Sequence, residues 1–270
     1  MKRQILYILV VMVFLFSCEK DADIKLPKVE PVLSVYGFLS PEDTITNIVV
    51  KNSRPFFGEK VNSTIDYVTD ARVEITIHGQ DYVLPYSEQT NSYYLDSNVL
   101  KIIPGEEYFI EVAAPDFPTV TSSTVILESN NETLELVKTT KPTDSGEYYF
   151  FNVRWTDNPN EKNYYRLTGY VYENSQVESL DRNNIFLYDD SDWSGHTITS
   201  NDLIYIGAGT ELHLILLNID YNYYQYHKTV RDFVLYGDLP FSEPVFVNSN
   251  IKNGVGVFAS FRKYEIIKTL

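Results

Sequence analysis

Residues 104–112 read Pro-Gly-Glu-Glu-Tyr-Phe-Ile-Glu-Val, a turn followed by the clearest sheet pattern in the chain. Tyr108, Ile110 and Val112 are separated by Phe109 and a glutamate. Because side chains of a strand point alternately to the two faces of a sheet, this spacing predicts a strand with one face in water. A tyrosine at the start of such a strand is typical of a β-sandwich corner, where its hydroxyl bonds to nearby backbone.

Short strands rich in β-branched and aromatic residues are predicted on both sides of this stretch. They are Val32–Phe38, Ile45–Val50, Arg72–His78, Tyr82–Pro85, Tyr93–Leu95, Tyr108–Ala113 and Thr119–Leu127. Strands of this length and spacing favour an immunoglobulin-like or fibronectin-like β-sandwich over residues 31–127.

A run of Ser, Asn and Glu at residues 128–132 interrupts the pattern and marks the predicted domain boundary. Residues 132–270 form a second predicted β-rich domain, with strands at Leu134–Lys138, Tyr148–Thr156, Tyr164–Glu173, Ile185–Tyr188, Glu211–Asn218 and Val255–Arg262. One amphipathic helix is predicted near residues 220–236, with Asp220 as N-cap and Gly237 at its end. The expected fold class is therefore mainly β.

Residues 1–17 resemble a lipoprotein signal peptide. A basic start is followed by the apolar run Ile5–Phe16, the small residue Ser17 and then Cys18, the only cysteine of the chain. We expect Cys18 to be diacylated and to anchor the mature chain in outer-membrane lipid. The alternatives are an uncleaved signal anchor, or a plain secretory signal in which the cysteine is accidental.

Residues 18–30 are predicted to be a lipidated tether. Its acidic start, Glu19, Lys20, Asp21 and Asp23, resembles the export signals that Bacteroidota place after the lipidated cysteine. This resemblance implies display on the outer face of the outer membrane, although any tether between lipid and domain must also be polar.

The chain of 270 residues has a net charge of −15, and the signal peptide carries basic residues but no acidic ones. Such a surface repels phosphate backbones and anionic headgroups, so neither nucleic-acid binding nor polybasic membrane binding is expected. Once Cys18 is acylated, no thiol remains for a disulfide, a cysteine-ligated metal or a nucleophile. No cofactor is predicted.

The segment 239–259 reads Leu-Pro-Phe-Ser-Glu-Pro-Val-Phe-Val-Asn-Ser-Asn-Ile-Lys-Asn-Gly-Val-Gly-Val-Phe-Ala. It resembles the end of the Bacteroidota lipoprotein family called domain of unknown function 4249, and Leu33–Phe38 and Ser53–Phe56 agree in order. The resemblance implies a surface lipoprotein with an N-terminal immunoglobulin-like domain, often encoded beside a TonB-dependent outer-membrane receptor, and without established enzymatic activity. By itself the segment predicts a final strand whose small residues, such as Gly256, let another backbone approach closely.

Two clusters are candidate binding sites. Asp189, Asp190 and Asp192 offer oxygen ligands for calcium, but without the EF-hand glutamate a solvated acidic loop is the favoured interpretation. Tyr221, Tyr223, Tyr224 and Trp193 are candidates for stacking on sugars or peptides, although at helical spacing half of the tyrosines must face the core. No other metal site is predicted.

Asp43-Thr44-Ile45 matches a short acceptor pattern associated with O-glycosylation in Bacteroidota, so Thr44 is a candidate modification site. A plain turn before a strand explains the same residues.

No catalytic motif is present. The four histidines are far apart in sequence, and neither a Gly-x-Ser-x-Gly elbow nor a phosphate-binding loop occurs. We therefore expect a non-enzymatic surface lipoprotein that is an accessory or ligand-capturing subunit of a TonB-dependent transporter. The alternatives are a stand-alone glycan- or peptide-binding lipoprotein and, least favoured, an unrecognised hydrolase.

Overall fold

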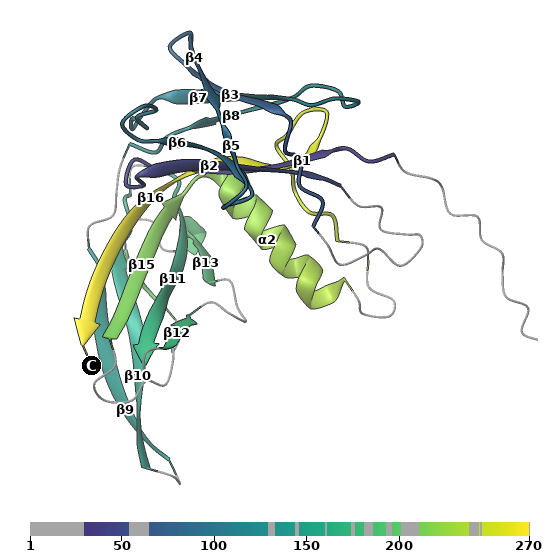
Figure 1. The fold of residues 1–270 in the computed structure, drawn as a ribbon. Helices are drawn as coiled ribbons and strands as arrows, with labels where there is room; N and C mark the ends of the chain where they lie inside the picture. Colours follow the sequence, from purple (N-terminus) through teal and green to yellow (C-terminus); the bar gives the residue numbers. More distant parts are fainter. Residues whose placement is uncertain are drawn as a thin grey trace, which may run out of the picture. The chain divides into compact units, whose positions relative to one another are not determined.

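The computed structural model describes residues 30–53, 65–128, 133–143, 146–159, 161–173, 176–180, 186–192, 196–200, 211–237, 243 and 245–269. These residues form a mainly β fold with three sheets and one α-helix (Figure 1). No helix among them is long and apolar enough to cross a membrane.

Two groups of strands share one core in the first half of the chain. One group is β1 (Leu33–Leu39), β2 (Ile45–Asn52), β6 (Ser92–Asp96) and β5 (Tyr86–Ser87). The other is the sheet of β4 (Gln80–Leu84), β3 (Arg72–Ile77), β7 (Glu107–Ala113) and β8 (Val120–Val125). Val35, Ile48, Ile75 and Ile110 are buried where the two groups pack together, as the period-two pattern predicts.

Tyr108 makes the predicted corner contacts. Its ring is fully buried, its hydroxyl donates to the Lys101 carbonyl at 2.8 Å, and it accepts the Ile103 N–H at 2.8 Å. Burial raises the pKa of this phenol, with the backbone bond from Ile103 opposing the shift. The hydrogen bonds satisfy a polar group that would otherwise be costly inside the core.

The second half contains a three-stranded sheet and most of a nine-stranded sheet. The smaller sheet is β9 (Glu135–Thr143), β10 (Gly146–Thr156) and β14 (Thr197–Thr199). The larger one begins with β12 (Gln176–Ser179), β11 (Tyr164–Glu173), β13 (Phe186–Asp189) and β15 (Glu211–Ile219). Trp155 of β10 is buried in the core between them.

The last strand, β16 (Val255–Thr269), connects the two halves. Its first part pairs in parallel with β1, from Ser34↔Val255 to Leu39↔Ser260, and its second part pairs antiparallel with β15. The nine-stranded sheet therefore runs in the order β12-β11-β15-β16-β1-β2-β6-β5, and its ninth strand, β13, pairs with β11 beside this path. The strand predicted at Val255–Arg262 was too short. The predicted domain boundary at residues 128–132 stays a prediction, because the nine-stranded sheet contains strands from both sides of it.

Gly256 allows the parallel pairing. Its φ is +117°, and a Cβ atom there would lie 2.0 Å from the carbonyl oxygen of Val35. No L side chain fits so close to a neighbouring backbone. The predicted close approach at this glycine is confirmed.

The predicted helix is α2 (Tyr221–Tyr236), and Asp220 is its N-cap. Gly237 ends it with a right-handed φ of −61°, and its N–H donates to the Phe233 carbonyl. The helix packs on β16 and β11 (Figure 1), and Tyr223 points into a small apolar cluster with Leu217 and Val257.

We predict that Gly256→Ala destabilises the protein by at least about 3 kcal/mol, because the new methyl group collides with backbone that cannot move without breaking the pairing. Urea unfolding followed by circular dichroism measures this. Gly79→Ala is the matched control: Gly79 also has a positive φ, but nothing lies within 4 Å of its added Cβ. The strain of φ alone costs about 1–2 kcal/mol, so equal losses for the two variants would contradict the prediction.

Candidate functional site

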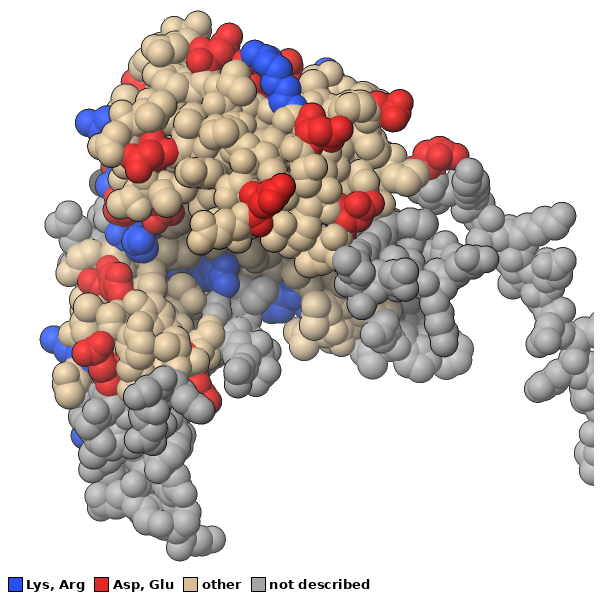
Figure 2. Space-filling view, viewed as in Figure 1, with Lys and Arg blue, Asp and Glu red and all other residues tan. Residues whose placement is uncertain are grey.

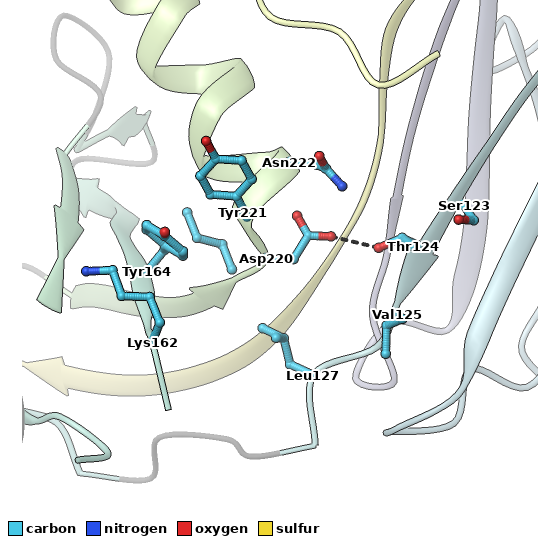
Figure 3. A pocket seen from close by; sticks show the side chains of 10 residues that line it. Ser123, Thr124, Val125, Leu127, Lys162, Tyr164, Asp220, Tyr221 and Asn222 are labelled. Atoms are coloured by element: carbon cyan, nitrogen blue, oxygen red, sulfur yellow. Dashed lines mark hydrogen bonds between the residues drawn. The ribbon is translucent and has the colours of Figure 1, made fainter. Parts of the chain in front are cut away.

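An open groove of about 580 Å³ lies between the end of β8, the start of β11 and the first turn of α2. In Figure 3, Tyr164 and Lys162 stand on the left of the groove, Val125 on the right and Leu127 near the bottom centre. Ser123, Thr124, Ile219, Asp220, Tyr221 and Asn222 complete the lining. The volume is within the usual range for small-molecule sites.

Asp220 holds the strands and helix around the groove in place. Its Oδ1 accepts the Tyr223 N–H of α2 at 2.7 Å, and its Oδ2 accepts the Thr124 hydroxyl of β8 at 2.7 Å. Oδ2 also accepts the Ser260 N–H of β16 at 2.9 Å. Burial raises the pKa of Asp220, while these hydrogen bonds oppose the shift. One carboxylate thus ties together a helix and two strands from different sheets.

Tyrosines from β11 and α2 form the aromatic side of the groove. The rings of Tyr164 and Tyr221 are 5.7 Å apart at an angle of 56°, and Tyr224 stacks on Tyr164 at 4.6 Å. Burial raises the pKa of Tyr164. Tyr221 is 57% exposed, so its ring is available to a ligand.

Lys162 is held in a small ionic cluster at the edge of the groove. Its ammonium donates to Asp190, to Asp189 Oδ1 at 3.2 Å and to the Ser191 hydroxyl at 2.8 Å. Burial tends to raise the pKa of Asp189, but hydrogen bonds from Ser191 and Lys162 outweigh it and lower the pKa to about 2. For Lys162, burial acts to lower the pKa, and its bonds to the two aspartates raise it overall.

Lys162 pairs with two of the three aspartates that the sequence offers as calcium ligands. Asp189 and Asp190 do come together, at the end of β13 and the start of the short helix η1 (Asp190–Asp192), but Lys162 already supplies positive charge between them. The Asp192 side chain lies outside the described part. Within that part, no three His, Cys, Asp or Glu side chains gather to form a metal site. Calcium binding stays an untested prediction.

The predicted stacking residues have different surroundings in the structure. Tyr221 lines the groove and Tyr224 supports Tyr164 from behind, whereas Tyr223 is only 5% exposed and accepts a hydrogen bond from Arg166 at 2.8 Å. The expectation that some helix tyrosines face the core is confirmed, and Trp193 lies outside the described residues. Sequence reasoning missed Tyr164 and Lys162, because nothing in their local sequence distinguishes them from ordinary strand residues.

Thr44 is exposed and directly precedes β2, so the turn interpretation holds. Its backbone carbonyl accepts the Ser97 N–H at 2.8 Å. The side-chain hydroxyl takes no part in this hydrogen bond. Its glycosylation is untested. The lipidation and export residues, Cys18, Glu19, Lys20, Asp21 and Asp23, lie outside the described residues.

The described histidines do not converge. His78 bonds Glu106 at 2.6 Å, and His227 stacks on Phe38 under α2. His213 lies between Glu211 and Glu265, at 2.9 Å from each. Hydrogen bonds from the His213 ring to the Glu211 and Glu265 carboxylates raise the pKa of His213. These contacts are structural.

Comparison with known proteins identifies one family. A family model described as a domain of unknown function (DUF4249) matches residues 19–267. The family expected from the segment 239–259 is thereby confirmed, and the match includes all residues of the groove. No curated protein matches the chain.

We predict that Asp220→Ala destabilises the protein by about 3 kcal/mol, because it removes a helix N-cap and leaves the Thr124 and Ser260 donors without an acceptor. Urea unfolding measures the loss. Asp232→Ala, on the same helix and paired among the described residues with Arg231 alone, is expected to cost less than about 0.5 kcal/mol. A loss for Asp220→Ala no larger than that of the control would show that the junction is not tied by this carboxylate.

We predict that Lys162→Met raises the pKa of Asp189 from about 2 towards the ordinary value of 3.8. In the parent, the ionised carboxylate stabilises the fold above pH 3.8, and that stability is lost as the pH falls through the folded pKa. Without the Lys162 ammonium, the folded pKa of Asp189 lies closer to its unfolded value, so the free energy of unfolding depends less on pH in this range. Carboxyl ¹³C NMR titration measures the pKa, with the exposed Lys268→Met as control; an unchanged pKa for Asp189 in Lys162→Met would refute the coupling.

Proposed function

This chain belongs to the family described as domain of unknown function (DUF4249), and we propose that it is a surface-exposed outer-membrane lipoprotein. In this proposal it is a non-enzymatic accessory or ligand-capturing subunit of a TonB-dependent outer-membrane transporter. The observation that carries the proposal is the open groove, whose aromatic side is exposed and whose charged side chains already have partners.

The chemistry of the groove supports binding rather than catalysis. Both oxygens of Asp220 accept hydrogen bonds, which leaves the carboxylate poorly placed to take a proton from a substrate. The Lys162 ammonium is held by two carboxylates, which keep it protonated and therefore not nucleophilic. None of the lining residues is a histidine or a cysteine. A hydrolase therefore stays the least favoured function.

The anchor part of the proposal rests on residues 1–30. If Cys18 is acylated, the tether of residues 18–30 spans at most roughly 45 Å when extended. That length keeps the folded part close to the membrane. Acidic side chains are scattered over the face shown in Figure 2, and the chain has a net charge of −15, so attachment through lipid suits this protein better than attachment through charge.

We further propose that residues 31–127 form an immunoglobulin-like or fibronectin-like sandwich, and residues 132–270 a second domain built against it through β16. The common core of the first half and the corner contacts of Tyr108 support this assignment.

A stand-alone glycan- or peptide-binding lipoprotein is the second candidate. It is favoured by the same aromatic pair, Tyr164 and Tyr221, which needs no partner protein to bind a ligand. The two candidates differ in whether a transporter accompanies the lipoprotein.

We predict that the full chain incorporates labelled palmitate in its native bacterium and that Cys18→Ser abolishes the label, because Cys18 is the only thiol in the chain. Gel fluorescence of an alkyne-labelled fatty acid measures incorporation. Ser17→Ala keeps a small residue before the cysteine and should retain the label. An unlabelled parent chain, or a labelled Cys18→Ser variant, would contradict lipidation.

Affinity purification of the lipidated chain in mild detergent, followed by mass spectrometry, tests the transporter role. A TonB-dependent barrel in near-equal amount is the expected result. Recovery of the lipoprotein alone would overturn the accessory-subunit proposal in favour of independent ligand binding.

A further inference from the structure

We propose that the groove between β8, β11 and α2 binds a neutral carbohydrate, with one sugar ring against Tyr221 and Tyr164. The inference names the ligand class of the groove and rests on the proposed ligand-capturing function.

The charges around the groove favour an uncharged ligand. Lys162 is neutralised by Asp189 and Asp190, and Asp220 accepts hydrogen bonds at both oxygens. An anionic ligand would have to draw Lys162 away from both aspartates, which would leave their negative charges unpaired. A cationic ligand would meet only one carboxylate in the lining, that of Asp220, whose two oxygens already accept hydrogen bonds. A neutral ligand keeps them all intact.

The two walls suit a flat ring with apolar faces. Tyr221 is 57% exposed on one side, next to Tyr164, and Val125 is 53% exposed on the other. Tyr224 stacks behind Tyr164 and so restricts the orientation of its ring. The C–H face of a pyranose packs on an aromatic ring much as another apolar group does, and the volume of about 580 Å³ leaves room for more than one sugar ring.

Two polar side chains of the lining are free to bind hydroxyl groups. Within the described part of the chain, the Ser123 hydroxyl and the Asn222 amide have no hydrogen-bond partner, and both line the groove (Figure 3). A hydroxyl and an amide can each donate and accept. Sugar hydroxyls also do both, so these groups match a carbohydrate better than a purely apolar ligand.

A peptide added as an extra strand fits less well. The outer edge of β8 is already closed at Thr121, which exchanges backbone hydrogen bonds with Lys252 at 2.9 and 3.3 Å. At Val125 the carbonyl accepts the Ser260 hydroxyl at 2.7 Å. Strand addition needs a row of free edge groups, and β8 has its own partners on both sides of the groove.

The experiment is isothermal titration calorimetry of the full chain, purified in mild detergent, with named probes at millimolar concentrations. Maltotriose, cellotriose and chitotriose represent neutral sugars, trigalacturonate a charged sugar, and hexaproline a neutral peptide. We expect at least one neutral sugar to bind, more tightly than trigalacturonate and hexaproline.

The matched pair of variants is Tyr221→Ala and Tyr236→Ala, because both tyrosines lie on α2 with similar exposure, 57% and 50%, but only Tyr221 lines the groove. Losing the stacked ring should weaken binding of that sugar about tenfold, and Tyr236→Ala should leave it unchanged. Equal effects of the two variants would place the sugar elsewhere and overturn the proposal.

Failure of this inference is distinct from failure of the proposed function. Tighter binding of hexaproline or trigalacturonate, or no binding of any neutral sugar, overturns the carbohydrate assignment even if a transporter copurifies. Conversely, sugar binding that depends on Tyr221 supports the assignment even if the lipoprotein is recovered alone.

Discussion

The parallel pairing of β1 with β16 is the constraint on which the rest of the structure depends. It places the last strand of the chain beside the first and lets β16 continue into its antiparallel pairing with β15. Parallel strands cannot be joined by a tight turn, and here residues 40–254 lie between the two paired segments. Gly256 is the point where this pairing is closest, because its missing Cβ leaves room for the Val35 carbonyl.

Asp220 fixes the position of the groove beside this sheet. The buried carboxylate would be costly without partners, and its partners come from three places: the first turn of α2, Ser260 on β16 and Thr124 on β8. Meeting that demand for hydrogen bonds holds the helix start beside β8. The groove is the space left between them, so its position is a consequence of satisfying one buried charge.

Local sequence patterns predicted most of the fold, and the errors have physical causes. Long alternating strands such as β3 and β7, and the capped helix α2, carry their signal within a few residues. The strands β12 and β14 are short and were missed, because their hydrogen bonds come from β11 and β10, distant in sequence. The end of β16 was missed for a related reason: its last residues are largely exposed, and the pairing with β15 rather than burial extends them to Thr269.

By itself, the sequence determined the mainly β class, the helix with its Asp220 cap and the family, because each of these depends on residues close together in the chain. Only the tertiary structure decided which tyrosines face solvent, that Lys162 pairs with both Asp189 and Asp190, and that Val125 and Tyr164 line the same groove. Those contacts join residues tens of positions apart. Their geometry is set by sheet pairing and by one buried carboxylate, and no local pattern records it.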